Sequence, residues 1–189
     1  MNLSPIGWAL RPLKNYANFS GRASRAEFWW FFLFMMITYM LVWFVLFAAV
    51  GVTAASASSS ATPSPLRMIG AFGLAGVFLV VFYLALLIPS IAVQIRRLHD
   101  TNRSGWWLGA FWLLYLAYLV VAFSSVFSMR VPSDGSPPNM GSVAAMSMIG
   151  LIFFVYSIVL LVFFCLAGTK GANRFGDDPY GANVEEVFA

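Results

Sequence analysis

Residues 28–52 read FWWFFLFMMITYMLVWFVLFAAVGV, an apolar run without one Asp, Glu, Lys or Arg. A helix needs roughly 20 such residues to cross the hydrocarbon core of a bilayer. Three further runs without charge reach that length, and the four predicted spans are residues 28–52, 72–95, 106–127 and 146–167. Lipid cannot satisfy an open backbone, and these runs lack the alternation of barrel strands. The sequence therefore predicts an all-α, polytopic membrane protein with four transmembrane helices.

The composition of the whole chain agrees with this fold class. Of its 189 residues, 61% are apolar and 10% are charged, whereas soluble domains average about 45–50% apolar and about 25% charged residues. A soluble globule, a disordered chain and a collagen-like fibre are thereby excluded. We predict a single membrane domain over residues 1–189. Because Cys165 is the only cysteine, neither an intramolecular disulfide nor a multi-cysteine metal site can form.

The basic residues are distributed unequally between the segments that connect the spans. Nine of the eleven Lys and Arg residues lie before the first span, between the second and third, or after the fourth, and only Arg67 and Arg130 lie in the other two loops. This positive-inside bias predicts two hairpins with both termini in the cytoplasm. Cations scattered in this way indicate topology rather than a nucleic-acid surface. The outer loops, 53–68 and 128–145, are rich in Ser, Ala, Pro and Gly and are predicted to be flexible linkers.

A cleaved signal peptide is the competing interpretation of the first apolar run. Small residues that would suit a signal peptidase follow it at 52–57. The apolar region of a signal peptide is about 7–15 residues long, which is shorter than this run. We therefore expect the first run to remain as a span.

Three polar clusters fall on the predicted cytoplasmic face, and the first is residues 21–29. Ser24 followed three positions later by Glu27 is a capping-box pattern, which predicts that the first span begins near Ser24. Arg22 and Arg25 are placed to reach lipid phosphates.

The second cluster is residues 96–107. Arg96 and Arg97 complement the negative end of a helix, and Asn102 suits a left-handed turn position. Asn102 or Ser104 can cap the third span.

The adjacent His99 and Asp100 are the most chemically suggestive residues of this second cluster. A carboxylate can orient an imidazole as a base or a metal ligand. Neighbouring residues seldom face each other, however. The favoured interpretation is that both side chains hydrogen-bond within a turn at the membrane interface.

The third cluster, residues 168–179, contains three glycines, Asn173 and Pro179, which predict an irregular, turn-rich segment. Asp177 and Asp178 fall short of the six or more oxygens that calcium takes. We expect them instead to pair with arginines of the other two clusters, namely Arg22, Arg25, Arg96 or Arg97.

In this order, and between four apolar spans, the clusters resemble the bacterial domain of unknown function 805 family of small inner-membrane proteins. The resemblance runs from about Phe19 to Pro179 and is carried by FSGR (19–22), EFW (27–29), RRLHD (96–100), RSGWW (103–107), NRFG (173–176) and DP (178–179). The chain departs from the family at Asn102, where Gly is frequent, and at Asp177, where Pro is common. The resemblance implies a bacterial inner-membrane location and no established activity.

The leading functional hypothesis is a structural or interaction protein in the lipid bilayer. Its cytoplasmic face would bind anionic phospholipid head groups, another membrane protein or a second copy of the chain. The candidate residues are Arg22, Arg25, Glu27, Arg96, Arg97, His99, Asp100, Arg103, Asn173, Arg174 and Asp178.

Three other interpretations stay open. One is a small oligomeric channel or transporter, although no ionisable residue lies near the middle of a span. Another is a membrane enzyme that uses His99, which the absence of a nucleophile motif disfavours. In the last, the clusters satisfy one another and only fix helix ends. We predict no catalytic residue, cofactor or metal.

Overall fold

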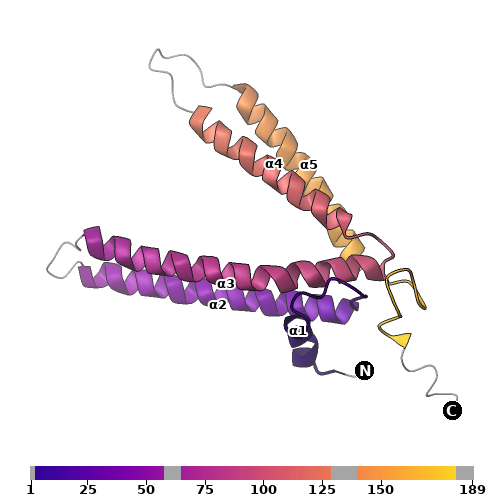
Figure 1. Ribbon diagram of the computed structural model, residues 1–189. Helices are drawn as coiled ribbons and strands as arrows, with labels where there is room; N and C mark the ends of the chain where they lie inside the picture. The colour runs from indigo at the N-terminus through magenta and orange to yellow at the C-terminus, as the bar shows by residue number, and fades with distance from the viewer. Residues whose placement is uncertain (1–2, 58–64, 129–139, 182–189) are drawn as a thin grey trace. The chain divides into compact units, whose positions relative to one another are not determined.

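The computed structural model describes residues 3–57, 65–128 and 140–181. Within these ranges the chain forms five helices (Figure 1): α1 (Pro5–Lys14), α2 (Arg25–Ala57), α3 (Pro65–Asp100), α4 (Trp106–Ser128) and α5 (Met140–Cys165). The loop after α5 adds one isolated bridge between Asn173 and Gly176. The described part of the chain is therefore helical, as the apolar runs predict.

Four of the described helices are long and apolar enough to cross a membrane. Their candidate spans are Arg25–Ala49, Gly73–Asp100, Trp106–Ser125 and Ala144–Cys165, and each overlaps one of the four spans predicted from sequence. The start of α2 at Arg25 lies one residue after the predicted start at Ser24.

The helices continue into ranges that the sequence assigned to the outer loops. Helix α2 runs on to Ala57, α3 begins at Pro65, and α5 begins at Met140. Two features favour the extension of α2. Alanine has a high helix propensity, and no proline interrupts the chain between the first apolar run and Pro63. Proline is also favoured at the first position of a helix, as at Pro65. The rest of the predicted linkers, 58–64 and 129–139, lies outside the described residues.

The chain divides into two compact units, and the division falls inside α3. One unit contains residues 1–19 and 26–93, which carry α1, α2 and most of α3. The other contains residues 20–25 and 94–189, which carry the end of α3, helices α4 and α5, and the loop after α5. The short segment before α2 therefore packs with residues far along the chain.

In the first unit, α2 and α3 lie side by side (Figure 1) and contact each other through aromatic side chains. Trp43 Nε1 donates a hydrogen bond to the Tyr83 hydroxyl at 3.1 Å. Tyr39 stacks on Tyr83 with ring centroids 5.0 Å apart and meets Phe82 edge to face at 6.0 Å. These contacts hold the two helices together.

Helix α1 is an element that the apolar runs did not predict. The Ser4 side chain accepts a hydrogen bond from the Gly7 amide at 3.2 Å, and Pro5 occupies the first helical turn. The Tyr16 hydroxyl, just beyond the helix, donates to the Ala85 carbonyl at 2.6 Å. Ser-Pro followed by leucine and isoleucine at helical spacing is the signal that would have found it.

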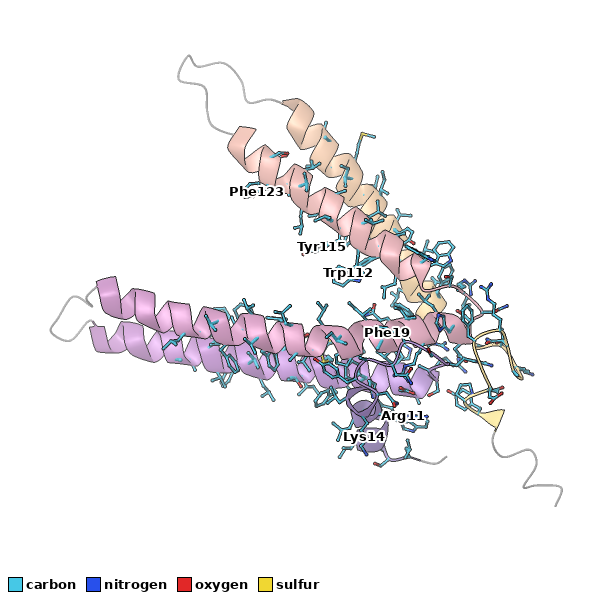
Figure 2. All side chains as sticks on the ribbon, viewed as in Figure 1. Arg11, Lys14, Phe19, Trp112, Tyr115 and Phe123 are labelled. Carbon is cyan, nitrogen blue, oxygen red and sulfur yellow. The ribbon has the colours of Figure 1, made fainter. Side chains whose placement is uncertain are left out.

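In the second unit, α4 and α5 also lie side by side (Figure 1). The Tyr156 hydroxyl donates to the Trp107 carbonyl at 2.8 Å. Trp107 also meets Phe163 edge to face at 5.1 Å, and the rings of Phe111 and Phe153 are 5.0 Å apart. Figure 2 labels Trp112, Tyr115 and Phe123 on α4.

Most of the large apolar side chains on the four long helices are exposed. Phe44 is 72% exposed and Leu74 is 77% exposed, as expected of surfaces that face lipid. Several charged side chains are buried instead, and Arg97, Glu27 and Asp100 are among the largest fully buried side chains. These buried charges lie at the ends of α2 and α3, where a functional site can form.

Candidate functional site

Asp100, the last residue of α3, is the centre of a buried cluster in the second unit. Arg22 Nε donates to Asp100 Oδ1 at 3.0 Å, and a terminal nitrogen of the same guanidinium lies 2.9 Å from that oxygen. Arg97, one helical turn before Asp100, donates to Oδ2. The side chains of all three residues are at most 1% exposed. We call Arg22, Arg97 and Asp100 the arginine–aspartate triad.

The two arginines of the triad also donate to carbonyls at the end of α5 and in the loop that follows it. Arg97 Nε donates to the Phe164 carbonyl at 3.1 Å, and a terminal nitrogen donates to the Leu166 carbonyl. Arg22 donates to the carbonyls of Thr169 and Gly171. The last carbonyls of a helix have no partner within the helix. The triad therefore caps α5 and fixes the path of the chain beyond it.

The loop after α5 caps the end of α3 in return. Both the amide and the hydroxyl of Thr169 donate to the Asp100 carbonyl, at 2.9 and 3.2 Å. The Asn173 side-chain amide donates to the His99 carbonyl at 3.0 Å and to the Thr169 hydroxyl at 2.9 Å. The last carbonyls of α3 thus accept hydrogen bonds from the loop after α5, and carbonyls at the end of α5 and beyond it accept hydrogen bonds from the arginines of the triad.

Glycine is required at two places in this loop. A Cβ atom at Gly168 would collide with the Asp100 carboxylate, so no side chain fits there. Gly171 has φ +74°, a conformation that residues with a side chain seldom adopt. The predicted irregular segment is confirmed, and its irregularity brings the backbone close to Asp100.

His99 and Asp100 face different partners. His99 Nδ1 lies 3.2 Å from the Gly21 carbonyl, and a carbonyl only accepts, so Nδ1 carries the proton of the neutral ring. The imidazole stacks on Phe175 with centroids 3.9 Å apart and planes 3° from parallel. Both oxygens of the Asp100 carboxylate already accept from the two arginines of the triad, which argues against a His99–Asp100 catalytic pair.

The turn between α3 and α4 follows the sequence prediction at Asn102. Its φ is +56°, in the left-handed region. The Arg103 amide donates to the Leu98 carbonyl at 2.9 Å, which closes the turn. Of the two capping candidates, Ser104 accepts a hydrogen bond from the Trp106 amide at 3.4 Å.

Among the described residues of the second unit, four cations are half-buried or exposed, and we call them the exposed rim. Arg103 is half-buried, with its guanidinium carbon 3.9 Å from the centre of the Phe163 ring. Arg174 is exposed, lies 4.6 Å from the Phe175 ring centre and donates to the Asn102 carbonyl at 3.2 Å. The other two members, both exposed, are Arg25 and Lys170.

Asp178 orders the loop through backbone hydrogen bonds. Its Oδ1 accepts from the Tyr180 amide at 2.9 Å and its Oδ2 from the Gly171 amide at 3.0 Å. The bond from Tyr180, followed by the bond from Gly171 and the charge of Arg22, lowers the pKa of the Asp178 carboxyl. Both Asp178 oxygens are thus used by backbone amides, Arg22 acts on this carboxylate through its charge, and the side-chain bond of Arg22 goes to Asp100.

The remaining candidates occupy different places. Glu27 belongs to the first unit, where Arg11 lies 3.7 Å from its carboxylate. Arg96 is 4% exposed, and its carbonyl accepts a bond from the Ala23 amide at 3.0 Å. Within the described ranges, no group of three His, Cys, Asp or Glu side chains could hold a metal.

Burial therefore divides the predicted binding cations into two sets. Arg22 and Arg97 are buried and committed to Asp100 and to carbonyls, so they are not available to a ligand outside the protein, and Arg96 is buried as well. Arg25, Arg103 and Arg174 remain accessible. Sequence reasoning missed the fourth rim cation, Lys170, although it lies inside the third polar cluster.

Four apolar helices joined to a buried polar cluster define a multi-pass membrane protein. The chain belongs to the family described as "Protein of unknown function (DUF805)", whose model matches residues 16–177. It is 32% identical to inner membrane protein YhaI of Escherichia coli K12 over 178 residues, covering 93% of this chain and 98% of that one.

A second relative, inner membrane protein YhaH of the same strain, is 30% identical over 174 residues, which are 92% of this chain and 97% of that protein. No solved structure gives a significant match. The chain is an integral inner-membrane protein of this family.

Proposed function

We propose that this protein has a structural or interaction role in the membrane, in which the exposed rim binds anionic phospholipid head groups. The arginine–aspartate triad fixes the chain segments that carry the rim residues. The observation that carries this proposal is the contrast in burial. The side chains of the triad are buried and their charges are paired with one another, whereas the rim cations of the same unit are accessible.

The triad supports a structural role because its charges are enclosed and bonded. A buried charge is tolerated only when it is paired and hydrogen-bonded. Both Asp100 oxygens accept from an arginine, and the arginines also donate to carbonyls at the end of α5 and in the loop after it. This arrangement fixes three chain segments relative to one another within the second unit: residues 20–25, the end of α3 and the loop after α5.

The rim supports lipid binding because two of its guanidinium groups are held in place. Arg103 lies on Phe163, and Arg174 lies on Phe175. A cation near an anionic membrane surface gains about 1 kcal/mol, and a guanidinium that is already ordered loses less freedom on binding. The planar guanidinium of arginine matches the geometry of a phosphate group.

The proposal includes the topology expected from the cation bias. The helices form two hairpins in a single membrane domain, residues 1–189, with both termini and the rim on the cytoplasmic side. Unequal distribution of Lys and Arg supports this orientation. The continuity of α3 through both compact units supports a single domain, since a domain boundary would have to cut a helix.

The test compares matched pairs of charge removals in the full-length protein. In nanodiscs of phosphatidylcholine and phosphatidylglycerol, electron spin resonance of spin-labelled lipids reports which head group is retained next to the protein. We expect R103Q/R174Q to lower the preference for phosphatidylglycerol by several-fold. The control R67Q/R130Q removes two cations outside the rim and is expected to leave most of that preference intact. An unchanged preference in R103Q/R174Q would reject lipid binding by the rim and leave a protein partner as its ligand.

A further inference from the structure

Helix α1 presents an exposed apolar face. Leu3 directly precedes the N-cap residue Ser4, and Ile6 and Leu10 within the helix follow the i, i+4 spacing that places side chains on one face. Leu3, Ile6 and Leu10 are 39%, 71% and 36% exposed. Ala9 and Pro12 are buried and lie on a different side of the same helix. Helix α1 therefore contacts the protein along one side and leaves a second, apolar side uncovered.

Two contacts within the first unit place α1 next to a membrane span. Arg11 lies 3.7 Å from the Glu27 carboxylate in the first turn of α2, and the Tyr16 hydroxyl bonds the Ala85 carbonyl of α3. Figure 2 labels Arg11 and Lys14 on α1. The candidate span of α2 begins at Arg25. The Arg11 contact thus holds α1 near the residue at which the candidate span of α2 begins, and the Tyr16 hydroxyl reaches a carbonyl inside the candidate span of α3.

The charge of this region complements an anionic lipid surface. Arg11 and Lys14 lie in the last turn of α1. The first acidic residue in the sequence is Glu27. The Arg11 guanidinium lies 5.5 Å from the centre of the Trp8 ring, and tryptophan is a residue that favours the membrane–water interface. An apolar face flanked by cations and tryptophan is the pattern of an interfacial helix.

We propose that α1 lies in the surface of the same membrane that α2 and α3 cross. Its apolar face of Ile6 and Leu10, together with the preceding Leu3, enters the boundary between head groups and acyl chains, and Arg11 and Lys14 meet lipid phosphates. Interfacial helices of this kind are buried roughly 5–10 Å into that boundary. The occupant of the uncovered face is anionic lipid. This inference is independent of the rim, which belongs to the other compact unit.

Spin labels on the full-length protein test the position of α1. Labels are attached to I6C and, as the control, to N102C in the exposed turn between α3 and α4, each in a C165S background, in nanodiscs that contain phosphatidylglycerol. Power saturation compares collision with oxygen, which concentrates in lipid, and with a water-soluble nickel chelate. We expect the label at position 6 to collide severalfold more with oxygen than the label at position 102, relative to nickel. A label at position 6 that is as open to nickel as the control, or shielded from both reagents by protein, overturns the proposal.

A second measurement separates the anionic contact from simple apolar burial. With the label at position 6, K14Q is expected to shift the depth parameter towards water in phosphatidylglycerol discs and to have a smaller effect in pure phosphatidylcholine discs. Equal shifts in both lipids would reject the contact with phosphate. The rim variant R103Q/R174Q serves as a control and should leave the label at position 6 where it is, so the two proposals can fail separately.

Discussion

At the scale of single residues, Asp100 is the group on which the contacts of the buried cluster depend. Its carboxylate is shared by Arg22 and Arg97, and its carbonyl accepts two bonds from Thr169. Removal of its charge would leave two guanidinium groups facing each other in a buried place. The consequence is a loss of stability rather than a loss of ligand binding alone.

We expect D100N to be strongly destabilised. Breaking a buried ion pair by removing one partner costs about 3–5 kcal/mol, and the asparagine cannot neutralise either arginine. Thermal unfolding in detergent, followed by circular dichroism, measures the effect. The exposed Asp177 provides the control, since D177N removes the same charge where no buried pair depends on it. A melting temperature for D100N equal to that of D177N would contradict the structural role of the triad.

Gly168 gives a steric test of the same site. In G168A the new methyl group must displace the Asp100 carboxylate, because its Cβ would overlap it. We expect a melting temperature several degrees lower than that of the natural protein. G73A is the control, since a Cβ at Gly73 meets nothing within 4 Å. If both variants melt together, the close approach of Gly168 to Asp100 is wrong.

The sequence predicted these residues better than it predicted their partners. The left-handed turn at Asn102 and the cap from Ser104 follow from local chemistry, which a short stretch of sequence contains. That Asp100 takes Arg22, which lies 78 positions away, depends on how the chain folds back. Charge alone made Asp178 an equal candidate, and only the fold shows that its oxygens are used by backbone amides.

At the scale of elements, the loop after α5 is a capping device that its own side chains hold in shape. Asp178 bonds the amides of Gly171 and Tyr180, and the Asn173 side-chain oxygen accepts from the Phe175 amide at 2.9 Å. Gly171 in turn presents its carbonyl to Arg22. The order of this loop therefore contributes to the fit of the triad.

The lowered pKa of Asp178 gives the loop a defined dependence on pH. Because the folded pKa lies below the ordinary value of 3.8, the carboxylate contributes order that is fully present above that value and is lost as the pH falls through the folded pKa. We expect D178N to speed hydrogen exchange of the Gly171 and Tyr180 amides near pH 7. Below the folded pKa, the natural protein and D178N should exchange alike. A difference that persists there would show that the carboxylate charge is not the cause.

Long elements were easier to predict than short ones. The four apolar runs identify the membrane helices because lipid imposes one requirement, sustained apolarity, on every position. Helix α1 is only 10 residues long, and its evidence lies in spacing and in a Ser-Pro start. The helix ends near Ala57 and Pro65 were missed because Ser- and Ala-rich sequence is compatible with both loop and helix.

At the scale of the whole molecule, the orientation expected from the cation bias is the prediction that links the rim to the cytoplasmic leaflet. Moving a guanidinium across the hydrocarbon core is expensive, so the turn that carries Asn102 and Arg103 is expected to stay inside. A single cysteine in that turn, N102C in a C165S background, should react with an impermeant maleimide in inside-out vesicles and remain unlabelled in intact cells. Asn102 is exposed, which makes it suitable for labelling.

A second reporter tests the side on which the carboxyl terminus lies. A fluorescent protein fused after Ala189 should mature and fluoresce, since the expected even number of crossings puts the carboxyl terminus on the same side as the turn. Labelling of N102C from outside the cell would place the rim against the opposite leaflet. The lipid-binding proposal would then lose its anionic surface, whereas the triad, which depends only on contacts inside one unit, would be unaffected.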